Sequence, residues 1–286
     1  MDAQLRIMTR ADIPDGMRLK EIAGWNQTAA DWERFLRAGP DGCFVAVAEG
    51  AGAGGKVCGT ATTIIYEGKF AWIGMVLVDP DFRGRGIGTG LLKKTIEHLD
   101  AKKIPSQKLD ATPAGKPIYE KLGFVVEYEL ERWVLNREIS GEDSSPTVAP
   151  TALNEMLKWD RDVFGAERGG LLRSLNDTDP DFTLTAAWEN KLSGYALGRR
   201  GSRADHLGPW VARDAPAARE LLDEFLRRSR RETIFADCFM DNPFARRLLA
   251  ERKFQSARPL TRMVRGTNQD PGRPELICAA LGPEFG

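Results

Sequence analysis

The chain has 286 residues, more than a single hydrophobic core usually serves, so we expect about two domains. With 42% hydrophobic and 29% charged residues, its composition is that of a soluble globular protein and excludes a mainly disordered chain. Lysine plus arginine and aspartate plus glutamate both number 41. The chain therefore has no net positive charge to attract nucleic acid or an anionic membrane, and we predict neither as a partner.

The cysteines and histidines offer no disulfide framework and no metal site. All four cysteines lie in apolar runs and form no Cys-x-x-Cys pair, which predicts buried thiols in a reducing compartment. They are Cys43, Cys58, Cys238 and Cys278. The two histidines, His98 and His206, are interpreted as structural or surface residues. Because the sequence starts without an apolar signal region and has no run of roughly 18 apolar residues, we expect a cytoplasmic protein.

The first half predicts a mixture of strands and helices. Thr28-x-x-Asp31 is a capping box that predicts the start of a helix through Trp32 and Phe35. Three β-type runs separated by glycine-containing turns then predict an antiparallel meander. The expected strands are 5–8, 43–49, 56–66, 70–78, 109–111 and 124–135, and the expected helices are 13–23, the one capped by Thr28, 87–99 and 116–122.

The polar segment 140–150, which contains two prolines, is the clearest break in composition. We place a linker there and predict domains at 1–139 and 151–286. The second half repeats the order of the first, and "NPFARRLLAERKF" (Asn242–Phe254) parallels "TPAGKPIYEKLGF" (Thr112–Phe124) at an offset of 130 residues. We infer an internal duplication. Its expected helices are 153–164, 168–175 and 217–228, and its expected strands are 182–188, 192–197, 207–211 and a closing strand to Gly266.

The segment "DFRGRGIGTGLL" (Asp81–Leu92) places glycines between an apolar strand and an amphipathic helix. Backbone N–H groups in the first turn of a helix have no partner inside the helix, and the helix dipole adds partial positive charge beside them. Glycines remove the Cβ atoms that would keep a diphosphate away from those donors, and the arginines add charge and forked donors. The segment therefore predicts a diphosphate site, made by Arg83, Gly84, Arg85, Gly86, Ile87, Gly88 and Thr89.

Two well-known phosphate-binding patterns do not fit this segment. The glycine spacing differs from the G-x-G-x-x-G of dinucleotide-binding folds, and the Gly-Lys-Ser/Thr of a P-loop is missing. The spacing Arg83-x-x-Gly86-x-Gly88 instead resembles the acyl-CoA-binding motif of the GNAT superfamily of N-acetyltransferases. The resemblance covers the first half, from Leu5 to about Leu135, in the order of elements and in a second motif, "IYEKLGF" (Ile118–Phe124).

The resemblance implies acetyl-CoA as the acyl donor and suggests roles for two further groups. In GNAT enzymes the tyrosine that matches Tyr119 commonly lies near the thioester sulfur and donates a proton to the departing thiolate. A positioned phenol can do so in a cleft that excludes water. The alternative is that Tyr119 is an ordinary surface residue of an amphipathic helix. In the same family, backbone groups pair with the pantetheine amides along the strand that matches Met75, Val76, Leu77 and Val78.

No motif identifies the general base. Many GNAT members carry a glutamate on the fourth strand, whereas this strand reads FAWIGMVLV and has no ionisable residue. Asp110, at the end of the strand before the Tyr119 helix, is the best-placed carboxylate, followed by Glu21 and Glu67. A water relay is the alternative. The segment 112–115 stands where many members have an asparagine, so a side-chain contact to the cofactor at that point stays open.

The second half lacks both motifs. "VARDAPAAREL" stands in place of the glycine loop, with Asp214 near the helix start, and Leu249 takes the place of Tyr119. A carboxylate at that helix end occupies the electrostatic site that a diphosphate would need. We therefore expect a degenerate, cofactor-free copy. Asn26 and Gln27, in the loop between the first two helices, are candidates for substrate binding, with loop or helix-end polar residues as the alternative.

Together these features predict the α/β (α+β) class, with two tandem GNAT-like domains, each a mostly antiparallel mixed sheet flanked by helices. The resemblance implies an N-acetyltransferase that moves an acetyl group from acetyl-CoA to the primary amine of a small molecule. The alternative is a non-catalytic acyl-CoA-binding sensor or interaction protein. Tyr119 favours the enzyme, because a binder needs no proton donor at the thiolate, whereas the missing fourth-strand glutamate favours the sensor. We expect a monomer whose halves form a pseudo-dimer, or a homodimer.

Overall fold

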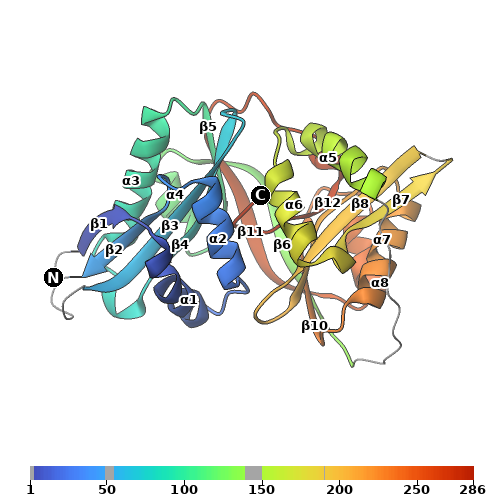
Figure 1. The fold of residues 1–286 in the computed structure, drawn as a ribbon, viewed down its shortest axis with the longest axis horizontal. Helices are drawn as coiled ribbons and strands as arrows, with labels where there is room; N and C mark the ends of the chain where they lie inside the picture. The colour runs from blue at the N-terminus through green and yellow to red at the C-terminus, as the bar shows by residue number, and fades with distance from the viewer. Residues whose placement is uncertain (1–2, 49–54, 139–149, 190) are drawn as a thin grey trace.

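The computed structural model describes residues 3–48, 55–138, 150–189 and 191–286. In Figure 1 the first half, coloured blue to green, lies beside the second, coloured yellow to red. The predicted linker, 140–150, lies outside the described residues except for Pro150, where helix α5 begins.

After a short edge strand, the first half has two helices that pack on a β-meander. The predicted capping box is confirmed, because the Asp31 carboxylate accepts from the Thr28 backbone N–H at 2.8 Å at the start of α2. The predicted strands 56–66 and 70–78 are confirmed at their bounds, whereas β5 begins earlier than predicted, at Ser106. The elements are β1 (Ala3–Ile7), α1 (Ile13–Ile22), α2 (Ala29–Ala38), β2 (Phe44–Ala48), β3 (Lys56–Tyr66), β4 (Phe70–Val78), α3 (Ile87–Ala101), β5 (Ser106–Ala111), α4 (Lys116–Glu120) and β6 (Val125–Asn136).

The second half repeats this order, as predicted. Two strands, β10 and β12, are absent from the sequence-based prediction. β10 contains a buried aspartate, Asp237, and follows a segment rich in arginine. The predicted strand 182–188 begins only at Leu184, after a 3₁₀ turn. The elements are α5 (Pro150–Phe164), α6 (Gly169–Thr178), β7 (Leu184–Trp188), β8 (Lys191–Arg200), β9 (Asp205–Ala212), α7 (Ala215–Arg228), β10 (Thr233–Phe239), α8 (Ala245–Glu251), β11 (Gln255–Gly266) and β12 (Ile277–Ala280).

One 12-stranded sheet runs through both halves, in the order β1-β2-β3-β4-β5-β11-β6-β10-β12-β9-β8-β7. The halves exchange strands at its centre, since β11 pairs with β5 and β6 pairs with β10. β6 and β11 pair antiparallel with Leu130 opposite Leu260, two residues that the 130-residue offset makes equivalent. An approximate two-fold axis therefore passes near this pair. This sheet is shared by the two predicted domains, 1–139 and 151–286. The boundary between these domains stays a prediction from the sequence.

In each half, two parallel strands separate after a short pairing, and the gap between them differs between the halves. In the second half, β9 and β10 pair in parallel only from Ile234 to Ala236, and β12 lies between them, antiparallel to both. In the first half, β4 and β5 pair in parallel only at Ala71 and Trp72. Among the described strands, none lies between β4 and β5. The first half therefore keeps open the gap that β12 fills in the second.

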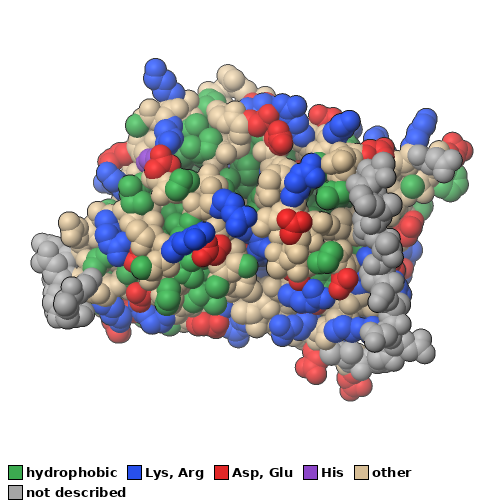
Figure 2. All heavy atoms as spheres, viewed as in Figure 1, with side chains coloured by type: hydrophobic (Ala, Val, Ile, Leu, Met, Phe, Trp, Pro, Cys, Tyr) green, Lys and Arg blue, Asp and Glu red, His purple; other side chains and the backbone are tan. Residues whose placement is uncertain are grey.

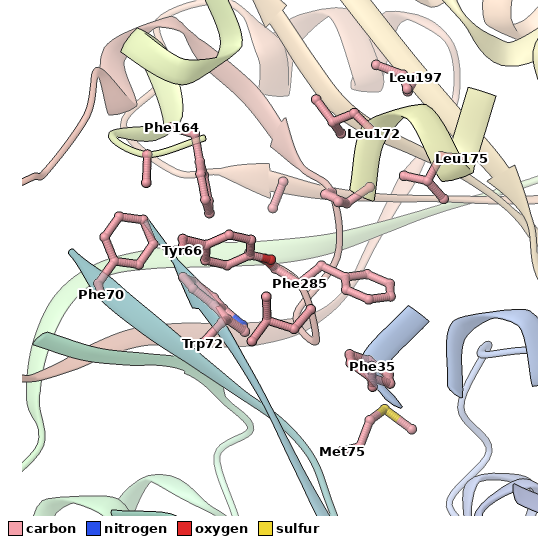
Figure 3. Close-up of a cluster of buried hydrophobic side chains, with 14 of the residues drawn as sticks. Phe35, Tyr66, Phe70, Trp72, Met75, Phe164, Leu172, Leu175, Leu197 and Phe285 are labelled. Atoms are coloured by element: carbon pink, nitrogen blue, oxygen red, sulfur yellow. The ribbon is translucent and has the colours of Figure 1, made fainter. Parts of the chain in front are cut away.

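After β12 the segment Leu281–Gly286, here called the tail, runs between the two halves. The ring of Phe285 stacks on Phe35 with centroids 4.7 Å apart, and the Tyr66 hydroxyl donates to the Phe285 carbonyl at 2.8 Å. Figure 3 shows Phe285 in a core cluster with first-half aromatic side chains on one side. The second half contributes Phe164, Leu172, Leu175 and Leu197 to the same cluster. The tail therefore ties the two halves into one core.

The surface and the cysteines agree with the composition. Figure 2 shows basic and acidic side chains interspersed over the face in view, as their equal numbers suggest. The four cysteines are buried free thiols, as predicted, and burial raises the pKa of Cys43 and of Cys238 to about 12. Within the described ranges, no helix has both the length and the apolar character needed to cross a membrane.

Candidate active site

A cavity of about 680 Å³ lies where β4 and β5 part. First-half segments supply most of its lining: β4, the loop before α3 and the first turn of α3, the end of β5 with α4, and the loop between α1 and α2. Residues distant in sequence complete the lining. They are Arg132 of β6, Arg258 and Leu260 of β11, and Pro283 and Glu284 of the tail. Both halves of the chain therefore build one cavity.

A bulge in β4 shapes one wall of the cavity. Met75 has a positive φ of 51°, an uncommon conformation for a side chain of its size, and the register with β3 shifts between Thr60 and Thr62. The Thr60 hydroxyl donates to the Met75 carbonyl at 2.8 Å and so holds the bulge. The residues from Met75 to Val78, which the sequence predicted as cofactor-binding, all line the cavity.

The glycine loop forms the cavity wall next to the end of β4. Gly84 and Gly86 have φ angles of +75° and +77°, which favour glycine, and a Cβ built on either would have no atom within 4 Å. Gly86 is the N-cap of α3, and the Gly90 N–H donates to its carbonyl at 2.8 Å. The N–H groups of the three residues between them have no partner inside the helix. The loop thus offers bare backbone donors beside open space.

The two arginines of the loop are exposed and differ in position. The Arg83 Nε donates to the Val78 carbonyl at 3.2 Å, and Arg83 lines the cavity. The Arg85 guanidinium donates to the Asp81 carbonyl at 2.9 Å and lies outside the cavity lining. Of the seven residues predicted at the diphosphate, six therefore line the cavity and Arg85 does not.

Tyr119 lies on α4 and lines the cavity. Its ring packs edge to face on Phe124, with centroids 6.0 Å apart. Burial raises the pKa of the Tyr119 hydroxyl to about 12, so the phenol keeps its proton at neutral pH. A protonated phenol in such a cavity can donate a proton to an anion that forms beside it.

The predicted carboxylates occupy unequal positions. Asp110 lines the cavity, but both its oxygens accept from the Arg262 guanidinium, at 2.7 and 2.8 Å. Burial raises the pKa of the Asp110 carboxyl, against the effect of that guanidinium. Glu21 and Glu67 lie outside the lining of this cavity. Asp110 is thus the predicted carboxylate that reaches the cavity, and its charge is already paired.

The two residues predicted to bind substrate are separated by the fold. Gln27 lines the cavity, and its Oε1 has no hydrogen-bond partner among the described residues. Asn26 is instead buried against the loop between β8 and β9. Its Nδ2 donates to the Ala204 carbonyl at 3.0 Å, and its Oδ1 accepts from the N–H groups of Arg203 and Ala204, both at 2.9 Å. Asn26 therefore braces the two halves, whereas Gln27 reaches the cavity, and substrate binding stays a prediction for both residues.

We expect Asn26→Ala to lower the free energy of unfolding by about 2 kcal/mol, because the N–H groups of Arg203 and of the buried Ala204 lose their acceptor. Acetyl-CoA affinity should not change. Urea unfolding and calorimetric titration measure the two quantities. The matched variant, Gln27→Ala, should leave stability unchanged and weaken acceptor binding. If Asn26→Ala kept full stability and weakened acceptor binding, Asn26 would bind substrate rather than brace the two halves.

The sequence-based prediction missed three charged residues of the cavity: Arg132, Arg258 and Glu284. None of them belongs to a motif. Arg258 and Glu284 lie far along the chain from the glycine loop and reach the cavity through the strand exchange and through the tail. In the sequence, Glu284 is a single glutamate between Pro283 and Phe285 and has no spacing to other residues that would indicate a site.

The second half differs from the first at the helix start, in the gap between the parallel strands and at the position equivalent to Tyr119. Asp214 caps α7, and its Oδ1 accepts from the Ala217 N–H at 2.9 Å, so the predicted carboxylate at this helix start is confirmed. β12 lies in the gap between β9 and β10. Leu249, at the position equivalent to Tyr119, is fully buried in the core.

Comparison with known families and proteins matches both halves. A model described as an acetyltransferase (GNAT) domain matches residues 39–126, and a second model of the same description matches residues 156–279. Holothin acyltransferase of Pseudoalteromonas sp. (strain SANK 73390) is 26% identical over 151 residues, 52% of this chain and 49% of that protein. N-alpha-acetyltransferase 30 of Homo sapiens is 29% identical over 139 residues, 46% of this chain and 37% of that protein. The chain thus covers half or less of each of these two relatives.

Two solved structures match all or nearly all of the chain. A putative acetyltransferase from Pyrococcus horikoshii superposes with a TM-score of 0.80 at 24% identity and covers 100% of this chain and 96% of its own. A GCN5-related N-acetyltransferase from Sphaerobacter thermophilus has a TM-score of 0.67 at 18% identity, with coverage of 92% and 95%. These likenesses show a shared fold. With the two domain matches, they confirm the predicted class of a mixed sheet in two GNAT-type domains.

Proposed function

Because the chain belongs to the GNAT acyltransferases, we propose that it transfers an acetyl group from acetyl-CoA to the primary amine of a small molecule. The observation that carries this proposal is the single cavity that joins the glycine loop, the bulged edge of β4 and Tyr119. The cavity also contains charged groups of the second half that an amine substrate can meet. The similarity to a holothin acyltransferase supports acyl transfer rather than binding alone.

The glycine loop fits the diphosphate of acetyl-CoA. Open space above Gly84 and Gly86 lets a phosphate approach the N–H groups at the start of α3, where the helix dipole adds positive charge. Arg83 at the cavity and Arg85 at the side of the loop add positive charge to this site. The edge of β4 from Met75 to Val78 lines the cavity without pairing with β5, and it is the edge along which the pantetheine amides would pair.

Tyr119 supplies the acid in this proposal. When the amine nitrogen attacks the thioester carbonyl carbon, the C–S bond breaks and the sulfur takes the phenol proton. The raised pKa keeps that proton on Tyr119 until negative charge develops on sulfur. Asp110 stays a candidate for proton acceptance, but its pairing with Arg262 makes it a weaker one.

The second half acts in this proposal as a cofactor-free domain that shapes the acceptor site. Asp214 occupies the helix end where a diphosphate would sit, and β12 fills the gap where pantetheine would lie. The shared core and the strand exchange make the two halves one unit, which favours a monomer built as a pseudo-dimer.

Calorimetric titration with acetyl-CoA should therefore give one site per chain. The physical reason is that only the first half, among the described residues, offers both bare backbone donors at a helix start and an open gap between parallel strands. A stoichiometry of two would show that the second half also binds the donor.

An acceptor screen tests the function directly. Amino acids, polyamines, amino sugars and aminoglycosides are incubated with acetyl-CoA, and release of free thiol is followed. Turnover of at least one small amine is expected. Tight acetyl-CoA binding without turnover of any amine would instead support the acyl-CoA sensor.

A further inference from the structure

We propose that the acceptor is an amine that also carries a carboxylate, with its ammonium group on Glu284 and its carboxylate on Arg258. This inference rests on the proposed function and names the substrate class of the same cavity. Its basis is a pair of opposite charges that line the cavity without a hydrogen bond to each other. Both residues come from segments outside the acetyl-CoA motifs.

Glu284 is fixed beside the β4 bulge. A Cβ on Gly74 would lie 2.8 Å from the Glu284 carbonyl oxygen, so the tail backbone packs directly on β4 next to Met75. The Trp72 indole N–H donates to the Pro283 carbonyl at 2.9 Å and holds the tail there. The diphosphate loop lies at the other end of this part of β4, where a Cβ on Gly88 would lie 3.3 Å from the Val78 side chain. Glu284 is therefore placed at the end of the cavity that an acceptor would occupy.

The Glu284 carboxylate has one engaged and one free oxygen. Its Oε1 accepts from Arg199, and its Oε2 is buried with no hydrogen-bond partner among the described residues. A Cβ on Gly282 would come within 2.9 Å of both Oε2 and the Arg199 guanidinium, so a larger residue there would displace this pair. A buried carboxylate oxygen without a donor is costly, and an ammonium group can satisfy it.

Arg258 supplies a cation to the same cavity. Its Nε is buried and has no hydrogen-bond partner among the described residues. Burial and the nearby Arg132 lower the pKa of Arg258, whereas Asp237 and Glu284 act in the opposite direction. A guanidinium in this setting favours a bidentate anion such as a carboxylate.

The other charges around Glu284 are already paired. Arg132 donates both to Asp237 Oδ1 at 2.8 Å and to Asp237 Oδ2 at 2.6 Å. The Arg199 Nη1 lies 3.1 Å from Asp31, which Arg34 also contacts. His206 lies 3.1 Å from Asp237, and burial lowers its pKa, so it is neutral at pH 7. In the described part of this region, the second oxygen of Glu284 and the guanidinium of Arg258 thus remain for a ligand, which matches the two ends of a zwitterion.

The reaction follows from this placement. The bound ammonium gives one proton to Glu284, and the neutral nitrogen attacks the acetyl carbonyl carbon. The nitrogen loses its second proton as the C–S bond breaks, and the sulfur takes a proton from Tyr119. The second nitrogen proton restores the Tyr119 phenol through solvent, and Glu284 releases its proton to solvent. The net products are the amide, the free thiol of coenzyme A and one proton.

A panel of matched acceptors tests the substrate class. Each α-amino acid, for example L-phenylalanine, is compared with its α-amide and with the amine that lacks the carboxyl group. The amino-acid members should show kcat/KM values roughly 10- to 100-fold above those of their amides. Equal or better turnover of amides or plain amines would overturn the zwitterion proposal while leaving N-acetyltransfer intact. A peptide amide as the best substrate would overturn it too and would point to polypeptide N-termini. No turnover at all, with acetyl-CoA still bound, would count against the proposed function itself.

The variant Arg258→Gln tests the carboxylate contact. It should raise the KM for the amino acid roughly 10- to 100-fold and leave the KM for the plain amine unchanged. Arg258→Lys should recover part of the loss. The control is Arg265→Gln on the same strand, because Arg265 binds Asp100 at the surface, at 2.8 and 3.0 Å. An equal effect of Arg258→Gln on both acceptors would exclude the contact.

The variant Glu284→Gln tests the ammonium contact through its pH profile. Glu284 is faced by Arg199 from β8, Arg132 from β6, Arg258 from β11 and the Tyr66 hydroxyl from β3. Without the carboxylate, the enzyme depends on free amine from solution, so kcat/KM should fall about 100-fold near neutral pH and rise about tenfold per pH unit toward the pKa of the amine. The control is Glu275→Gln, an exposed residue. A loss that does not recover at high pH would show that Glu284 only holds the tail in place.

Discussion

Gly86→Val should raise the Kd for acetyl-CoA at least about 100-fold, which corresponds to about 2.7 kcal/mol. Two effects act together. Valine is strongly disfavoured at the φ of +77° that Gly86 adopts, so the loop must change its conformation at the N-cap of α3. A Cβ at this position also projects into space that is open in the structure and that the diphosphate needs. Titration calorimetry on the purified variant measures the loss.

The control for this variant is Gly68→Val. Gly68 has a φ of +70° and open space where a Cβ would lie, so valine meets the same backbone strain there, at a turn between β3 and β4. Gly68 lies outside the cavity lining. Both variants should lose a similar amount of stability, on the order of 1–3 kcal/mol, and only Gly86→Val should lose acetyl-CoA. If Gly86→Val bound acetyl-CoA with wild-type affinity, the diphosphate would not bind at this loop.

Tyr119→Phe should lower kcat about 100-fold and leave the Kd for acetyl-CoA unchanged, because the lost proton donation belongs to the transition state. The ring remains, so its packing on Phe124 and the melting temperature should stay the same. Since burial raises the pKa of Tyr119 to about 12, the wild-type rate should show no loss from phenol ionisation up to about pH 10. Rapid-quench measurement of the chemical step separates this effect from product release.

The control for Tyr119→Phe is Tyr195→Phe. The Tyr195 hydroxyl donates to Asp160 at 2.6 Å in the second half, outside the cavity lining, and Asp160 keeps its pairing with Arg168. This variant should change stability and not kcat. Because a water can partly replace the phenol, a tenfold loss in Tyr119→Phe still fits the role. An unchanged chemical step would return Tyr119 to an ordinary helix residue and strengthen the sensor alternative.

Local signals in the sequence were sufficient for most of the fold. A capping box, a glycine-rich turn and a run of alternating residues act over a few positions, so their effects depend mainly on their near neighbours in the chain. The start of α2, the bounds of β3 and β4, and the glycine loop before α3 were predicted for this reason. β10 escaped prediction because its buried Asp237 is tolerated through Arg132 and His206, which are partners on other strands.

The cavity beyond the glycine loop was decided by the tertiary structure. Asn26 and Gln27 are adjacent polar residues of one loop, and only contacts with the second half assign one to bracing and the other to the cavity. Arg258 and Glu284 carry no local signal, because their position depends on the exchange of β6 and β11 and on the path of the tail after β12. The sequence by itself determined the two related halves and predicted one diphosphate site at the glycine loop. Which residues meet the acceptor depends on long-range packing, since charges distant in the chain gain their function only where the fold brings them together.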